Sequence, residues 1–188
     1  MSDRRRLLAR LFIALDLPGD ARQALESIQP WGVPGVRLVA PDQLHLTLHF
    51  LGEVDETVGQ QLSSVLAEVP SPPLTLVLSG VGQFPEKGPA QILWAGVAEN
   101  PELRQLRREI EARLSAAIGS RGESRPWRPH ITLARVTSSG LSGPIRDWLS
   151  RQSVFHCAPV VIERWSLYRS DLGAGGPRYS VMMSRLCG

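Results

Sequence analysis

The sequence predicts an α+β fold whose strands pair antiparallel. Apolar stretches of strand length occur in clusters and do not alternate strictly with helices, as they would in a parallel α/β protein. Longer stretches between them carry apolar residues at helical spacing. The 188 residues are 43% hydrophobic, which is ordinary for a globular protein of one domain. We therefore expect residues 1–188 to form a single domain.

The expected strands are short and spread along the whole chain. They are expected at residues 9–17, 36–39, 44–51, 74–78, 92–97, 130–136, 160–168 and 179–186. The alternation of apolar and polar side chains that marks a half-buried strand is clearest at 44–51. Glycine and proline are frequent at 80–90 and 172–177, and both segments are expected to be connections.

The expected helices begin and end at recognisable capping residues. They cover about residues 18–28, 55–69, 101–119 and 144–151. Asp55 can cap the second helix through its carboxylate. Pro101 suits the first turn of the third helix, and Gly119 suits its end. The second and third helices carry apolar residues at helical spacing, which predicts one buried face on each.

The basic residues are almost all arginine. Of the 21 lysines and arginines, Lys87 is the only lysine, and the formal net charge is +3. Lys87 lies in a turn-like segment with no sign of a buried, activated amine. This composition argues against enzymes that form a lysine–nucleotide adduct or a Schiff base, and the sequence contains no P-loop. Arginine offers forked donors that suit phosphate groups and stacking on bases.

The cysteines and the N-terminal segment bear on where the protein works. Cys157 and Cys187 show no metal-binding spacing, so a reducing cytoplasm is the simpler expectation. The arginine-rich start superficially resembles a signal peptide, but Arg10 and Asp16 limit the uncharged stretch to residues 11–15. No stretch approaches the ~20 apolar residues of a membrane span. We expect a cytoplasmic protein with no membrane contact.

Two expected strands contain the same pattern, His-apolar-Thr-Leu. Its polar members are His45 and Thr47 in the first strand, and His130 and Thr132 in the second. Because side chains at i and i+2 of a strand lie on the same face, each histidine shares a face with its threonine. The apolar residues between them point to the other face. If the two strands meet across a pseudo-two-fold axis, the four polar groups surround one small site.

These residue types suit a displacement at phosphorus without a metal. Two imidazoles that titrate near neutral pH can act as base and acid, and two hydroxyls can donate to the non-bridging phosphate oxygens. The alternatives are a structural role for the histidines and a metal site. In a regular strand His45 and His49 share a face but lie about 13 Å apart, too far to bind one metal ion. We therefore expect no metal, and we interpret His49 as solvated or at the edge of the site.

These motifs resemble those of the two-histidine phosphoesterase superfamily, and more narrowly those of the bacterial and archaeal RNA 2′,3′-cyclic phosphodiesterases, also called 2′-5′ RNA ligases. Further segments resemble this family in the same order along the chain, at 10–15, 44–54, 82–85, 93–97, 129–135 and 168–172, followed by Tyr179. The resemblance implies two pseudo-symmetric, intertwined lobes. Each would hold an antiparallel sheet with outer helices, and the sheets would face one another across a V-shaped central cleft.

The resemblance also implies an activity, the hydrolysis of an RNA 2′,3′-cyclic phosphate end to a 2′-phosphate, with 2′-5′ ligation as the reverse reaction. It implies His45 as proton donor and His130 as proton acceptor, with Thr47 and Thr132 completing the catalytic set. The residues alone leave the order of acid and base open, because the two motifs are nearly symmetric. No cofactor is implied. The partner would be RNA with a 2′,3′-cyclic phosphate end, and we expect a monomer.

Two residues that follow the motifs are candidates for substrate binding. Phe50 and Arg135 each lie five residues after a motif histidine. Strict alternation places both on the face opposite the histidines, whereas a bend or bulge places them beside the phosphate. An aromatic ring and a guanidinium are natural stacking surfaces for a base. The resemblance favours Arg135 as a substrate contact, and core packing is the alternative for Phe50.

Two other functions stay open. One is a cyclic phosphodiesterase for small nucleotides such as ADP-ribose 1″,2″-cyclic phosphate, which would gain no rate from RNA beyond the terminal nucleotide. The other is a non-catalytic RNA-binding protein that uses the same cleft. The presence of both histidines and both threonines argues against this last alternative.

Overall fold

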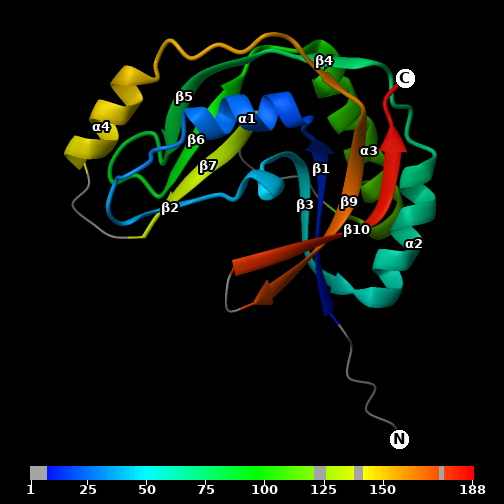
Figure 1. Ribbon diagram of the computed structural model, residues 1–188. Coiled ribbons are helices and arrows are strands. Elements are labelled where there is room, and N and C mark those ends of the chain that lie inside the picture. Colours follow the sequence, from blue (N-terminus) through cyan, green and yellow to red (C-terminus); the bar gives the residue numbers. More distant parts are fainter. Residues whose placement is uncertain (1–7, 121–125, 138–141, 174–175) are drawn as a thin grey trace, which may run out of the picture.

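One antiparallel sheet holds most of the strands (Figure 1). The computed structural model describes residues 8–120, 126–137, 142–173 and 176–188. The strands of this sheet are β1 (Leu8–Asp16), β2 (Val36–Leu38), β3 (His45–Asp55), β5 (Leu78–Phe84), β6 (Ile92–Val97), β7 (His130–Val136), β9 (Arg164–Gly173) and β10 (Gly176–Leu186). Their order across the sheet is β10-β9-β1-β3-β7-β6-β5, and β2 pairs with β7. All these pairs are antiparallel, which confirms the expected α+β class.

The helices follow the expected caps. They are α1 (Gly19–Ser27), α2 (Glu56–Ala67), α3 (Pro101–Ile118) and α4 (Ser142–Arg151), and a short 3-10 turn, η1, covers Pro41–Gln43. The Asp55 carboxylate accepts a hydrogen bond from the Thr57 N–H at 3.0 Å at the start of α2. Gly119 ends α3 with φ of 64°, a conformation that favours glycine. Within the described ranges, no helix combines the length and the apolar character needed to cross a bilayer.

The two halves of the chain exchange strands. β1 pairs with β3 in the first half, as β6 pairs with β7 in the second, and the halves meet at β3 and β7 through the register pair of Leu46 and Ile131. β5 lies beside β6, and β9 and β10 lie in turn beside β1, so each half is flanked by strand from the other. The short strands β4 (Leu74–Leu76) and β8 (Val160–Ile162) pair in a second sheet.

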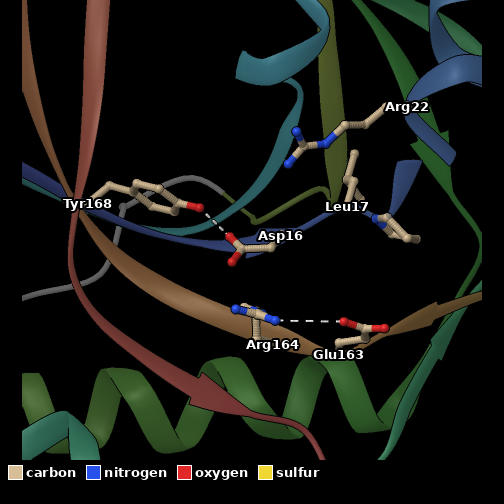
Figure 2. A pocket seen from close by; sticks show the side chains of 7 residues that line it. Asp16, Leu17, Arg22, Glu163, Arg164 and Tyr168 are labelled. Carbon is tan, nitrogen blue, oxygen red and sulfur yellow. Dashed lines mark hydrogen bonds and ion pairs between the residues drawn. The ribbon is translucent and has the colours of Figure 1, made fainter. Parts of the chain in front are cut away.

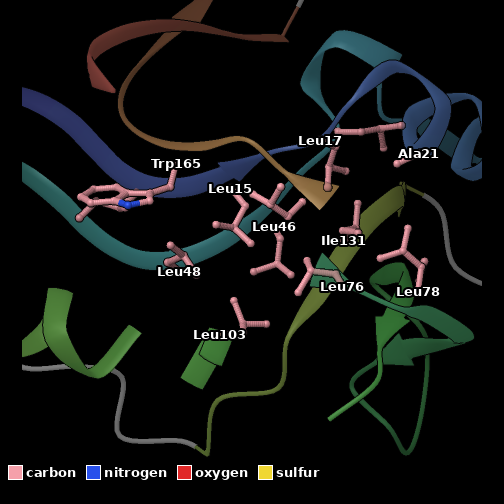
Figure 3. Packing of buried hydrophobic residues seen from close by; sticks show 14 of the residues in the cluster. Leu15, Leu17, Ala21, Leu46, Leu48, Leu76, Leu78, Leu103, Ile131 and Trp165 are labelled. Atoms are coloured by element: carbon pink, nitrogen blue, oxygen red, sulfur yellow. The ribbon is translucent and has the colours of Figure 1, made fainter. Parts of the chain in front are cut away.

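The core lies against one face of the large sheet (Figure 3). The central strands supply alternate residues that are at most 1% exposed, namely Leu11, Ile13, Leu15, Leu46, Leu48, Ile131 and Leu133. Helix α3 packs against them with Leu103, Leu106, Ile110 and Leu114. Each such side chain contributes about 1.5–3 kcal/mol by burial. Because the core takes this face, the intervening side chains of the central strands point to the opposite face.

Three of the expected segments differ in the structure. At 172–177, where a connection was expected, β9 runs to Gly173 and β10 begins at Gly176. β5 lies where a connection was expected, because Gly80 and Gly82 hide the strand pattern. A side chain has no room at Gly82, since a Cβ there would lie 2.2 Å from the indole of Trp94 on β6. The single strand expected at 160–168 is divided into β8 and β9, which belong to different sheets.

Candidate active site

The two motif histidines are held in the same way at the starts of β3 and β7. Nδ1 of His45 lies 2.6 Å from the carbonyl oxygen of Gln43, and Nδ1 of His130 lies 2.8 Å from that of Arg128. A carbonyl oxygen only accepts hydrogen bonds, so each Nδ1 donates its hydrogen. This contact fixes the orientation of each ring. It also makes Nε2 the nitrogen that can exchange a proton with a substrate.

The two motifs meet at the residue pair that joins the halves. Leu46 and Ile131 are opposite one another and fully buried. The antiparallel direction places each motif histidine alongside the threonine of the other motif, on the face away from the core. Burial lowers the pKa of His45, and the nearby charges of His130 and Arg135 lower it further. The four polar groups of the motifs therefore gather on one face, as the repeated pattern predicts.

A β-bulge interrupts each motif strand at the same point. The register of β3 with β1 skips Leu48, and the register of β7 with β6 skips Leu133. In each motif the skipped residue is the leucine that follows the threonine. An extra residue in one strand reverses the alternation of faces beyond it. The residues after the two leucines therefore lie on the faces opposite to those of regular alternation.

Phe50 and Arg135 reach the histidine face because of these bulges. Both side chains are exposed. The ring of Phe50 lies 5.8 Å from that of Phe12, which in turn lies 5.0 Å from the ring of His45. Arg135 is close enough to His45 for its charge to add to the effect of burial on the pKa of that ring. Of the two arrangements considered from the sequence, the bulged one is correct.

His49 lies on the core face as a result of the same bulge. It is only 4% exposed. Its Nε2 lies 3.3 Å from Oγ of Ser120, and its Nδ1 lies 3.6 Å from the carboxylate of Glu111 on α3. The interpretation of His49 as solvated or at the edge of the site is wrong, because the extra residue at Leu48 turns it toward α3.

Aromatic rings flank both motif histidines. The ring of His45 lies 5.0 Å from Phe12 and 5.4 Å from Tyr179, measured between ring centroids. The ring of His130 lies 4.9 Å from Phe84 in an edge-to-face contact. These contacts desolvate one side of each imidazole. Phe12 and Phe84 were given no role at the site from the sequence, because they stand on strands that contain no motif.

The neighbouring strands give the two histidines different surroundings. Asp16, at the end of β1, is the register partner of His45, whereas Gly96 of β6 is the register partner of His130. Burial lowers the pKa of His45, and the carbonyl of Gln43 and the carboxylate of Asp16 act against burial by raising it. The position beside His130 leaves no room for a side chain, since a Cβ on Gly96 would lie 2.6 Å from a backbone carbonyl oxygen of β5.

Hydroxyl groups hold the Asp16 carboxylate in place. The phenol of Tyr168 donates to it, as Figure 2 shows, and Oγ of Ser166 donates to it at 3.0 Å. Burial and the Asp16 carboxylate both raise the pKa of Tyr168, so its phenol stays protonated and remains a donor. Asp16 is a site residue that sequence reasoning missed, because only the register of β1 with β3 brings it to His45.

The structure also bears on metal ligands. In the part of the chain that is described, no three histidine, cysteine, aspartate or glutamate side chains gather where they could hold a metal ion. Cys157 and Cys187 are free thiols.

Known proteins are similar to this chain in sequence and in fold. The family model of the 2′-5′ RNA ligase superfamily matches residues 17–174. The RNA 2′,3′-cyclic phosphodiesterase of Archaeoglobus fulgidus is 32% identical over 172 residues, which cover 90% of this chain and 96% of the relative. The protein of the same name from Escherichia coli is 33% identical over 174 residues, which cover 91% and 92%. The crystal structure of Escherichia coli LigT in its apo form has a TM-score of 0.75 at 28% identity, and the match covers 96% of this chain and 98% of that one. These matches confirm the resemblance seen in the sequence, and the chain belongs to the 2′-5′ RNA ligase superfamily.

Proposed function

We propose that this protein hydrolyses RNA 2′,3′-cyclic phosphate ends to 2′-phosphate ends by acid–base catalysis that needs no metal. The observation that carries the proposal is the gathering of two His–Thr pairs on one face around the Leu46–Ile131 pair. Relatives named RNA 2′,3′-cyclic phosphodiesterase match nine-tenths of the chain, which supports the same substrate class. Residues 1–188 act as one domain, whose partner is RNA that ends in a cyclic phosphate.

In this reaction His130 accepts a proton and His45 donates one. Nε2 of His130 takes a proton from water as the water oxygen attacks phosphorus. The bond between phosphorus and the 3′ oxygen breaks, and Nε2 of His45 gives its proton to that oxygen. The product keeps the phosphate on its 2′ oxygen, and exchange with solvent restores both histidines. Positioned proton transfer of this kind contributes about 10²–10⁴-fold to the rate.

Four further side chains act on the substrate in this proposal. The hydroxyls of Thr47 and Thr132 donate to the non-bridging oxygens, where negative charge grows in the transition state. Arg135 offers its guanidinium to the phosphate or to the face of a base, and Phe50 offers an aromatic surface to a base. The bulges support these last two roles, since they place both side chains on the histidine face.

The register partner of His45 supports its role as the acid. A neighbouring carboxylate favours the protonated form of an imidazole, and Asp16 stands beside His45. Burial lowers the pKa of His45, and the Asp16 carboxylate offsets part of this effect. In the equivalent strand position, the register partner of His130 is Gly96.

The reverse reaction is 2′-5′ ligation, in which a ribose 5′-hydroxyl takes the place of water. It needs no lysine adduct, which agrees with a chain that has Lys87 as its only lysine. Because one chain carries both motifs, the reaction needs only a monomer. We place the protein in the cytoplasm, where free thiols such as Cys157 and Cys187 stay reduced.

The test is to incubate the purified protein, with EDTA present, with an oligoribonucleotide that ends in a 2′,3′-cyclic phosphate. Chromatography against synthetic standards should identify a 2′-phosphate end. A 3′-phosphate product would contradict the assigned leaving group, and loss of activity with EDTA would contradict the metal-free reaction. Binding without turnover would favour a non-catalytic RNA-binding protein. A clear preference for ADP-ribose 1″,2″-cyclic phosphate over RNA would favour an enzyme for small substrates.

A further inference from the structure

A polar pocket lies beside His45, where the end of β1, the start of α1 and the start of β9 come together (Figure 2). It encloses about 280 Å³. Asp16 lines it and is the register partner of His45, so the backbones of these two residues lie one strand spacing, about 4.8 Å, apart. Tyr168 also lines the pocket and stacks on Phe12 at 5.1 Å, and Phe12 contacts His45. The pocket therefore shares Asp16 and Tyr168 with the surroundings of His45.

Three of the four charged side chains that line this pocket already have partners. The carboxylate of Asp16 accepts a hydrogen bond from Tyr168. The carboxylate of Glu163 and the guanidinium of Arg164 lie 3.8 Å apart, and both side chains are exposed. The fourth charged side chain is Arg22 of α1.

Arg22 enters the pocket with its charge unpaired. Its side chain is partly buried, and its Nε atom is buried without a hydrogen-bond partner among the described residues. The ion pairs found within those residues do not include Arg22. In Figure 2 its guanidinium is directed into the pocket, toward the side where Tyr168 lies. A partly desolvated guanidinium that lacks a carboxylate is suited to an anion, and phosphate oxygens match its forked donors.

We propose that this pocket binds the phosphate on the 5′ side of the terminal nucleotide, with Arg22 as its main contact. The inference rests on the proposed function and deepens it. In RNA this phosphate is the diester that links the terminal nucleotide to the preceding one, so it is the phosphate nearest along the chain to the cyclic phosphate between the histidines. A nucleoside cyclic phosphate that lacks a 5′-phosphate leaves Arg22 unpaired. The pocket thereby makes the enzyme prefer RNA chains to single nucleosides.

Three substrates test this proposal. They are adenosine 2′,3′-cyclic phosphate, the same compound with a 5′-phosphate, and the dinucleotide ApA that ends in a 2′,3′-cyclic phosphate. In the wild-type protein the 5′-phosphate and the dinucleotide should each raise kcat/KM about tenfold or more over the first compound, as a charge-assisted hydrogen bond would. Arg22→Gln should bring both ratios close to one. Arg22→Lys should keep part of each ratio, because it retains the charge and loses the fork.

Arg146→Gln is the matched control, since Arg146 is an exposed arginine on α4 and the change in net charge is the same. It should keep the wild-type ratios. Ratios that survive Arg22→Gln in a folded protein, or a wild-type protein that gains nothing from the 5′-phosphate, would overturn the inference and leave the proposed function standing. A wild-type protein that hydrolyses none of the three substrates would instead overturn the proposed function. Thermal melting of each variant separates lost binding from lost folding.

Discussion

The two halves of the site share a geometry but differ in the residue that the neighbouring strand places beside each motif histidine. In both halves the motif histidine donates Nδ1–H to the carbonyl two residues earlier, contacts aromatic rings and precedes a bulge. The strand partner of His45, however, is Asp16, whereas that of His130 is Gly96. The repeated motif therefore sets where the groups stand, and the strand beside His45 adds a carboxylate that raises the pKa of that imidazole. Two residues that look interchangeable in sequence can in this way take different roles.

Replacing either histidine should have the largest effect and shows whether the halves differ in role. His45→Ala and His130→Ala should each lower kcat/KM on cyclic phosphate RNA about 10²–10⁴-fold, because each variant lacks one partner for proton transfer. A p-nitrophenyl phosphodiester has a leaving group that needs no proton. On this substrate the loss in His45→Ala should be much smaller, while His130→Ala should keep its full loss. His156→Ala, at an exposed histidine outside the motifs, is the control and should behave as wild type.

The different roles of the two histidines would be contradicted if both variants lost the same factor in kcat/KM on both substrates. That result would mean that neither histidine is specifically the donor to the leaving group. If His130→Ala alone recovered on the p-nitrophenyl diester, the order of acid and base would be reversed.

Replacing the threonines tests the phosphate contacts that the two halves have in common. Thr47→Val and Thr132→Val keep the branched shape and remove the hydroxyl, and each should lower kcat about 10²-fold, as loss of one transition-state donor does. Serine at either position should restore most of the rate. The pH dependence should stay unchanged, because a hydroxyl does not titrate in this range. A large loss in one variant with almost none in the other would contradict a symmetric phosphate site.

The motifs could be predicted from the sequence because their signal is local. A threonine two residues after a histidine shares its face in any strand, whatever surrounds it. The bulges could not be predicted, since Leu48 and Leu133 have the same apolar character as the core leucines beside them. The positions of Phe50 and Arg135 depended on those bulges and therefore stayed open until the register was known.

Asp16 and β5 show a second limit of sequence reasoning. Asp16 comes to His45 only through the pairing of two strands, β1 and β3, between which α1, β2 and η1 lie along the chain, so nothing within either segment marks the contact. β5 contains Gly80 and Gly82, which normally indicate a turn. Gly82 belongs in the strand because the Trp94 ring occupies the space of its side chain, and that reason lies in a different strand.

Asp16→Asn should have the smallest of these effects, and it addresses the difference between the halves directly. Asparagine has the same size and can still accept a hydrogen bond from Tyr168, but it carries no charge. Burial already lowers the pKa of His45, and removing a carboxylate that raises this pKa lowers it further. A proton donor must be protonated to act, so kcat/KM should fall at every pH above the new pKa. One pKa unit corresponds to about a tenfold loss.

The direction of this effect with pH decides the role of His45. Below its pKa, His45 is protonated with or without the Asp16 charge, so the loss should shrink as the pH falls and grow as the pH rises. Asp20→Asn, the same change at an exposed residue of α1, is the control and should keep the wild-type profile of kcat/KM against pH. A loss that is equal at every pH would mean that Asp16 acts only by holding the structure. A gain in activity at acid pH would mean that His45 must be deprotonated to work. The Asp16 carboxylate would then slow the reaction, because it favours the protonated form of the base.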